Sequence, residues 1–207
     1  MLQREQQPEG MELDVLKEIA NIGAGNAVTA LSQMISNKID MHVPRVKMLT
    51  FQELASIIGG PETLVAGIMV SLSGDIEGSM LFILENHDAH HLVGKLMGYQ
   101  LDEIQTEVFT EIEQSALTEI GNIITGAYLN SISKMTNLKI VTSIPYIAID
   151  MAGAILSVPA IEFGKLGDKA LLIQSTFRDM EVDISGYFIM IPTLESYSGI
   201  LKALGIG

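Results

Sequence analysis

Cysteine is absent from all 207 residues of the chain. Its absence excludes a disulfide framework, thiolate metal ligands and every mechanism with a cysteine nucleophile, including that of the thiol-dependent deamidases. Hydrophobic residues make up 48% of the sequence. The chain can therefore bury a sizeable core and is expected to be globular.

Basic residues are scarce. There are 12 lysines and arginines against 25 aspartates and glutamates, which gives a formal net charge of -13. A surface of this sign repels phosphate backbones and anionic lipid, so neither nucleic-acid binding nor membrane binding is expected. The same field weakly disfavours acidic protein partners, which must therefore be recognised through local complementarity.

Long uninterrupted hydrophobic runs are also missing. The most apolar stretch, from Ile144 to Ile161, is broken by Pro145, Asp150 and Pro159, which argues against a membrane span and favours a buried strand and helix. Residues 1–10 form a polar tail without the apolar core of a secretory signal. The sequence therefore predicts a cytoplasmic location.

An internal repeat organises the chain. A shift of 101 residues aligns the segment from Leu16 to Pro44 with the segment from Leu117 to Pro145, and 11 of these 29 positions are identical. Ordinary residue usage would give identity at roughly one position in fifteen or twenty. The identical pairs are Leu16/Leu117, Glu18/Glu119, Ile19/Ile120, Asn21/Asn122, Ile22/Ile123, Gly25/Gly126, Ser32/Ser133, Met34/Met135, Lys38/Lys139, Ile39/Ile140 and Pro44/Pro145.

Each half is expected to contain the same elements: a long helix, a strand near the proline, a helical stretch, an apolar hairpin and a short final helix. We place the repeats at about 11–100 and 108–207, within a single domain that covers residues 1–207. Each half alone would leave an exposed sheet edge and an uncovered face. The predicted fold is therefore α+β, a pseudo-twofold duplicated unit with one antiparallel sheet shared by both halves and the long helices packed on it.

The long helices carry the residues that could act chemically. Successive helical residues turn by about 100°, so Asp14, Glu18, Asn21 and Gly25 lie within roughly 60° of one another, as one stripe. The second half repeats the stripe with Ser115, Glu119, Asn122 and Gly126.

A purely structural interpretation of one stripe is that its polar residues face solvent and that its glycine permits close helix packing. For a single copy this is the better interpretation. However, asparagine is a poor helix former, and neither helix propensity nor solubility requires it at the same place relative to glutamate in both halves. The repetition therefore favours a functional interpretation.

The full pattern is Asp or Ser, three residues, Glu, two residues, Asn, twenty-two residues and Pro. With it, the sequence resembles the CheC, CheX and FliY family of bacterial chemotaxis phosphatases, and its doubled motif is most similar to the CheC members. The resemblance covers nearly the whole chain. The residues that carry it are Asp14, Glu18, Asn21 and Pro44, and again Ser115, Glu119, Asn122 and Pro145.

The resemblance implies a substrate and a mechanism. The substrate would be the aspartyl phosphate of a CheY-like receiver domain, with the Mg²⁺ bound by the receiver and no cofactor bound by this chain. Asn21 or Asn122 would hold the attacking water, as a GTPase glutamine does. Glu18 or Glu119 would pair with the receiver's active-site lysine, with general-base action less favoured because the transition state is loose.

The other motif residues receive supporting roles. Asp14 and Ser115 would help to hold the helix start or the docking surface, Gly25 and Gly126 belong to the same stripe, and Pro44 and Pro145 would mark strand entry.

The family resemblance also implies a regulatory partner, the deamidase CheD, and a duplicated chain has little need to dimerise, so we expect a monomer. One alternative from another functional class stays open: a non-enzymatic adaptor that binds phosphorylated CheY and CheD.

A metal site is a weaker hypothesis. His87 and His91 share a helical face at i, i+4, next to Asp88 and His90. Two histidines without an evident third ligand are more often a polar helix start. The matching segment of the second half, Glu195 to Ser198, contains no histidine, so such a site would not belong to the duplicated function. We therefore predict no metal ligands in this chain.

Overall fold

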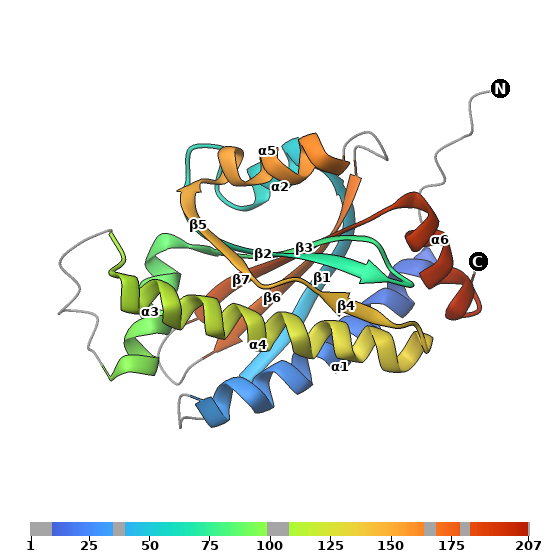
Figure 1. The fold of residues 1–207 in the computed structure, drawn as a ribbon, viewed down its shortest axis with the longest axis horizontal. Coiled ribbons are helices and arrows are strands. Elements are labelled where there is room, and N and C mark those ends of the chain that lie inside the picture. Colours follow the sequence, from blue (N-terminus) through green and yellow to red (C-terminus); the bar gives the residue numbers. More distant parts are fainter. Residues whose placement is uncertain (1–9, 35–39, 99–107, 164–168, 179–182, 207) are drawn as a thin grey trace.

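The structure is a computed structural model that describes residues 10–34, 40–98, 108–163, 169–178 and 183–206. It consists of two consecutive runs of similar elements (Figure 1). The first run contains α1 (Gly10–Met34), β1 (Asp40–Thr50), α2 (Phe51–Ile57), β2 (Leu64–Gly74), β3 (Gly78–Glu85) and α3 (Asn86–Met97). The second contains α4 (Glu111–Thr136), β4 (Ile140–Thr142), β5 (Tyr146–Met151), α5 (Ala152–Phe163), β6 (Lys169–Arg178), β7 (Asp183–Pro192) and α6 (Leu194–Ala203).

All strands join one seven-stranded antiparallel sheet with the order β1-β6-β7-β3-β2, and both β4 and β5 pair with the outer side of β2. The hairpins β2–β3 and β6–β7 each belong to one half. The remaining strands are exchanged: β1 of the first half pairs with β6 of the second, whereas β4 and β5 of the second half pair with β2 of the first. Neither half therefore completes its part of the sheet with its own strands.

The two halves meet at the centre of the sheet, where β3 pairs with β7. Phe82 lies directly opposite Phe188 in this pairing, and the two rings stack with their centroids 4.6 Å apart. Every residue of β3 except Glu85 is buried, because helices cover both faces of the sheet. The central strands of the sheet are thus buried on both faces.

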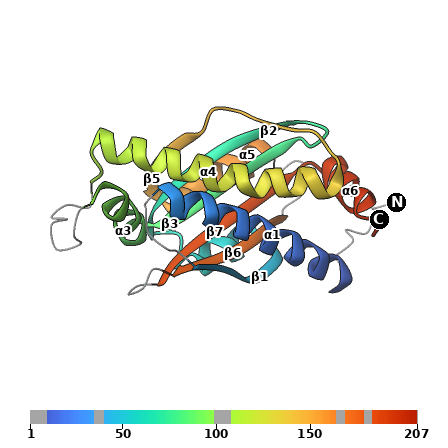
Figure 2. The same cartoon turned by 90° about the horizontal axis from the view of Figure 1, so that it is seen from below.

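The helices form a layer on each face of the sheet, as Figures 1 and 2 show. The long helices α1 and α4 lie on one face and run in opposite directions, and α2 and α5 lie on the other. Helices α3 and α6 lie at opposite ends of the molecule. The apolar residues of α1 recur at helical spacing and form its buried side: Leu16, Ile19, Ala20, Ala24, Ala27 and Leu31.

This arrangement confirms the predicted α+β fold, with a duplicated unit, a shared antiparallel sheet and long helices packed on it. The hairpins and the short final helices also follow in the predicted order, and Gly98 ends α3 in the left-handed conformation at φ 78°. Within the described part of the chain, no helix is long and apolar enough to cross a membrane. The polar tail, apart from Gly10, and residues 101–107 between the two expected repeats lie outside the described residues.

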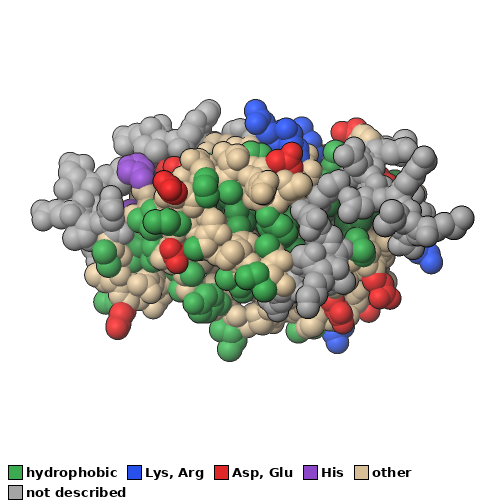
Figure 3. Space-filling view, turned by 90° about the horizontal axis from the view of Figure 1, so that it is seen from above, with side chains coloured by type: hydrophobic (Ala, Val, Ile, Leu, Met, Phe, Trp, Pro, Cys, Tyr) green, Lys and Arg blue, Asp and Glu red, His purple; other side chains and the backbone are tan. Residues whose placement is uncertain are grey.

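The segment from Ile144 to Ile161 is less buried than its composition suggests. It forms β5 and α5, but Ile144 is 90% exposed, Ile161 77% and Tyr146 65%. β5 lies at the edge of the sheet, and α5 buries only the side that faces the sheet, with Ile155 and Leu156. Hydrophobic side chains consequently show on the face of the molecule seen in Figure 3.

The two motif prolines lie at equivalent, irregular places of the edge strands. Pro44 lies inside β1, where the register with β6 shifts between His42 and Arg45, and not at the start of the strand as expected. Pro145 lies in the gap between β4 and β5. Proline has no N–H to donate to the ladder, so edge strands and irregular pairings are the places in a sheet that accept it.

The exchange of strands predicts that the halves do not fold separately. Residues 1–105 and 106–207, expressed as separate fragments, should each lack native-like chemical-shift dispersion in NMR spectra, because β1 would lack β6 and β5 would lack β2. Mixing the fragments should restore the dispersion of the intact chain, which serves as the control. Independent native-like folding of either fragment would contradict this prediction.

Candidate functional site

The start of α4 is fixed by a capping box. The hydroxyl of Thr110 accepts a hydrogen bond from the backbone N–H of Glu113 (3.3 Å), and the Glu113 carboxylate accepts one from the backbone N–H of Thr110 (2.7 Å). At the other end Asn137 adopts the left-handed conformation, with φ 56°. The limits of α4, and hence the direction of its side chains, are therefore set locally.

α1 and α4 contact each other closely, and this contact fixes their relative orientation. A Cβ built on Gly23 of α1 would lie 2.8 Å from the Tyr128 ring of α4, so only glycine fits there without a shift. Asn26 donates from its side-chain amide to the Ser131 hydroxyl across the two helices (2.9 Å). The Tyr128 hydroxyl lies 2.9 Å from that of Ser175 in β6, and burial raises the pKa of Tyr128.

The start of α1 is close to α6. Burial, with a smaller contribution from the carboxylate of Glu12 in α1, raises the pKa of Tyr197 in α6 to about 12. An apolar cavity lies beneath α1, lined among others by Leu16, Ile19 and Tyr128. The residues that α1 turns toward the sheet are thus apolar, and its polar residues must project from the opposite side.

The first stripe projects outward, as its helical spacing predicts. Asp14, Glu18, Asn21 and Gly25 are all exposed, whereas Ile19 and Ala20 between them are buried. The stripe therefore lies on the solvent side of α1, and its members are available to a partner.

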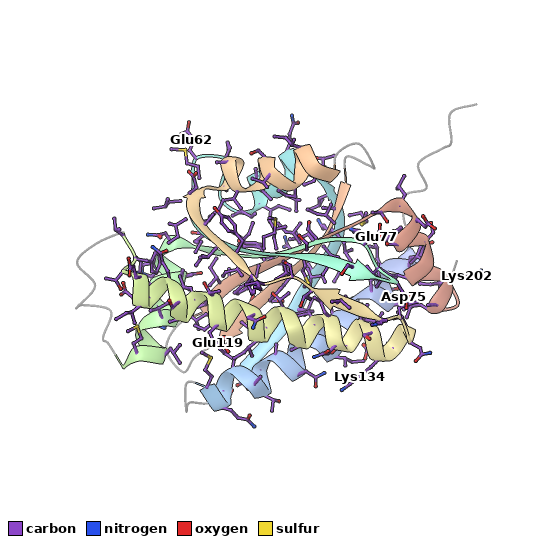
Figure 4. The ribbon with its side chains drawn as sticks, in the orientation of Figure 1. Glu62, Asp75, Glu77, Glu119, Lys134 and Lys202 are labelled. Atoms are coloured by element: carbon purple, nitrogen blue, oxygen red, sulfur yellow. The ribbon has the colours of Figure 1, made fainter. Side chains whose placement is uncertain are left out.

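The second stripe has the same disposition on α4. Ser115, Glu119 and Asn122 are exposed and Gly126 is partly exposed, while Leu117 and Ile120 are buried against the sheet. Figure 4 shows Glu119 on the side of α4 that faces away from the sheet. Both stripes are consequently on convex helix surfaces of the same face of the molecule.

The acidic and amide side chains of the stripes have no structural task within the described residues. No described residue makes a hydrogen bond or ion pair with the side chains of Glu18, Asn21, Glu119 or Asn122. An exposed asparagine within a helix does not contribute to helix stability. These four side chains are therefore free to bind a ligand. Packing does not explain why the same Glu-x-x-Asn pattern occurs in both halves.

Ser115 is not the residue that holds the helix start. Its hydroxyl donates to the backbone carbonyl of Glu111 (2.8 Å), one turn earlier, and Thr110 with Glu113 provides the cap. Asp14 likewise lies one turn inside α1, which begins at Gly10. For Asp14 and Ser115, the predicted role at the docking surface therefore remains a prediction.

The two histidines of the metal hypothesis face different environments. The side chain of His87 is 76% exposed and lies 3.5 Å from the Asp88 carboxylate, whereas His91 is buried. No group of three or more histidine, aspartate or glutamate side chains within the described ranges could hold a metal ion. The expectation of a chain without metal ligands stays a prediction.

A protein-family model matches the two segments of the chain that contain the stripes. The model of the CheC-like family matches residues 11–48 and 112–146, which include both stripes and both prolines. The CheY-P phosphatase CheC of Bacillus subtilis (strain 168) is 34% identical over 196 residues, which are 94% of this chain and 94% of the relative. The chain belongs to the CheC-like family.

Solved structures with the same fold carry other names. Thermotoga maritima FliY has a TM-score of 0.78 and 20% identity, and the match covers 97% of this chain and 98% of the other. A chain of the CheX–CheY–BeF3–Mg²⁺ complex from Borrelia burgdorferi has a TM-score of 0.50 and 21% identity, covering 81% and 94%. At these identities the likeness shows the fold alone.

Two exposed isoleucines lie next to the stripes and were not identified from the sequence. Ile22, adjacent to Asn21, is 40% exposed, and Ile112 is 68% exposed. Ile112 precedes Glu119 by seven residues, two helical turns, so it lies on the same side of α4. Large exposed apolar side chains beside polar ones are suited to contact with a protein surface. The seven-residue spacing was the signal that could have revealed Ile112.

Proposed function

We propose that this member of the CheC-like family hydrolyses the aspartyl phosphate of CheY-like response regulators, with one site on α1 and one on α4. The observation that carries the proposal is the pair of outward-facing Glu-x-x-Asn stripes, Glu18 with Asn21 and Glu119 with Asn122. It is supported by the 34% identity, over nearly the whole chain, to a protein named CheY-P phosphatase.

The shape of the site suits a protein substrate. Both stripes lie on the exposed, convex sides of their helices, whereas sites for small molecules are usually concave. A convex helix face can enter a concave site on another protein. The phosphoryl group, its Mg²⁺ and the surrounding pocket would accordingly belong to the receiver, and the helix would add only the groups that the receiver lacks.

The reaction requires little covalent chemistry from this chain. A water attacks the phosphorus, the bond between phosphorus and the aspartyl oxygen breaks, and the receiver's carboxylate leaves, so an aspartate and inorganic phosphate are formed. The amide of Asn21 or Asn122 accepts a hydrogen bond from this water through its oxygen and donates through its nitrogen. It thereby holds the water in line with the breaking bond.

Glu18 and Glu119 orient the complex. Each precedes its asparagine by three residues and lies on the same side of the helix. A carboxylate at this place can pair with the lysine of the receiver's active site. Because the transition state for phosphoryl transfer is loose, proton removal from the water contributes little, and a charge pair explains the glutamate better than general-base catalysis.

Phosphate release from a purified phosphorylated CheY-like receiver tests the proposal. Substoichiometric amounts of the intact chain should accelerate release, whereas an adaptor that only binds the receiver would slow it or leave it unchanged. Asn21→Ala or Asn122→Ala alone should leave part of the acceleration, because the other half still acts, and the double variant should lose it.

The control for this experiment is Gln52→Ala, which removes an exposed side-chain amide of α2, on the opposite face of the sheet from both stripes, and should keep the full rate. The free energy of unfolding of the double variant should stay equal or rise slightly, because alanine is the better helix former. A folded double variant that still hydrolyses the receiver's phosphate at the wild-type rate would contradict the catalytic assignment.

Replacing both glutamates should affect docking as well as turnover. Glu18→Gln with Glu119→Gln removes the charges but keeps the side-chain shape, and should raise KM about tenfold, because a charge-assisted hydrogen bond is lost. Glu195→Gln, an exposed glutamate of α6, is the matched control. An unchanged KM together with a lowered kcat would instead indicate that the glutamates act on the reacting water.

We also propose CheD as a regulatory partner, a monomeric chain, and the cytoplasm, where CheY-like receivers act, as the location. The basis for CheD is the family resemblance of the sequence. Purified CheD should comigrate with this chain in size-exclusion chromatography and increase phosphate release in the assay above. Separate elution of the two proteins at micromolar concentrations would argue against the partnership.

A further inference from the structure

Glycines inside helices need a reason, because glycine is among the poorest helix formers. Gly23 and Gly121 have one in this structure. A Cβ on Gly23 would lie 2.8 Å from a ring carbon of Tyr128, and a Cβ on Gly121 would lie 2.9 Å from the side chain of Ile68 in β2. Both glycines allow their helices to approach neighbouring elements.

Gly25 and Gly126 have no such reason. Apart from the adjacent residues and the backbone of its own helix, no described heavy atom lies within 4 Å of the Cβ position at either residue, and neither has the positive φ that would favour glycine. Beyond the backbone hydrogen bonds of the helix, the carbonyl of Gly25 accepts from the Thr29 hydroxyl (3.0 Å), which it would do equally in alanine. Among the described residues, therefore, these glycines do not permit close helix packing, and that suggestion is wrong for this part of the chain.

Their position connects them with the proposed sites. Gly25 follows Asn21 by four residues and Gly126 follows Asn122 by four, so each glycine lies one turn further along the same outward stripe. The same residue without internal contacts thus occurs at the same place in both halves. Contact with a partner protein at both sites explains the two glycines better than two unrelated coincidences.

We propose, on the basis of the phosphatase function proposed above, that Gly25 and Gly126 are the points where the receiver domain lies directly on the helix backbone. Glycine is the residue that allows such an approach. A methyl group would add a carbon about 1.5 Å from the Cα and hold the receiver away from the helix. The amide of Asn21 or Asn122, one turn away, would then no longer reach the water at phosphorus. Gly25 and Gly126 are positioning residues that set the depth of docking.

The receiver is the occupant because the glycines continue the surface of the proposed sites. Asn21 and Gly25 are separated by a single turn of a helix that is exposed on this side. Any protein whose phosphoryl group reaches Asn21 must also cover Gly25. A small ligand would not require a flat approach to the backbone at this distance.

The test is the variant Gly25→Ala with Gly126→Ala in the full chain. The probe for binding is a CheY-like receiver loaded with beryllofluoride and Mg²⁺, and the probe for turnover is the phosphorylated receiver. We expect affinity and kcat/KM each to fall about tenfold to a hundredfold, because displacements near 1 Å have effects of this size in oriented reactions. Each substitution should at the same time raise Tm by about 2–4 °C, because alanine is the better helix former.

Two matched variants separate docking from stability. Gly199→Ala, in α6, also has no described atom within 4 Å of its Cβ position, and should raise Tm without changing affinity or turnover. Gly23→Ala, two residues before Gly25, should lower Tm through its clash with Tyr128.

Unchanged affinity of the Gly25→Ala, Gly126→Ala variant for the loaded receiver would overturn the inference, and so would a fall in Tm, which would assign the glycines a structural role. The phosphatase function fails separately, namely if the Asn21→Ala, Asn122→Ala variant retains the wild-type rate. Retained activity in the glycine variant together with lost activity in the asparagine variant would refute only the docking role.

Discussion

The position of both proposed sites depends on the contact between Gly23 of α1 and the ring of Tyr128 of α4. There the two long helices approach so closely that a Cβ on Gly23 would lie 2.8 Å from the ring. Tyr128 is in turn held by Ser175 of β6, 2.9 Å from its hydroxyl. Both helices therefore share one face of the sheet, bury their apolar sides there, and present Asn21 and Asn122 to solvent. A rigid convex face of this kind suits the proposed insertion into a receiver.

The exchange of strands makes the two sites parts of one structure. β1 completes the sheet beside the second hairpin, and β5 beside the first, so each helix packs on strands from both halves. The halves are nevertheless not identical. β1 is one strand of 11 residues, whereas its counterpart is divided into β4 and β5 around Pro145. At equivalent positions of the repeat, Val43 is 4% exposed and Ile144 is 90% exposed.

The sequence allowed the repeated elements, the α+β class and the outward stripes to be predicted, because helical spacing and residue identity are local signals. It did not reveal that β1 pairs with β6, because the apolar residues of a strand do not determine which hairpin that strand pairs with. The exposure of Ile144 and Tyr146 followed from their place at a sheet edge, and Pro44 lies inside β1 because an edge strand accepts a bulge. The repeat distinguishes Gly25, which matches Gly126, from Gly23, but only the tertiary contacts show that Gly23 is packed against a neighbouring helix and Gly25 is not.

The most direct measurement is the structure of the intact chain bound to a CheY-like receiver carrying beryllofluoride and Mg²⁺. The beryllofluoride stands in for the phosphoryl group of the aspartyl phosphate. We predict that the amide of Asn21 or Asn122 lies within hydrogen-bonding distance of the water in line with the beryllium. Glu18 or Glu119 should pair with the receiver's lysine, and the receiver should contact Gly25 or Gly126. A receiver bound elsewhere, with both asparagines still exposed to solvent, would contradict the proposed mechanism.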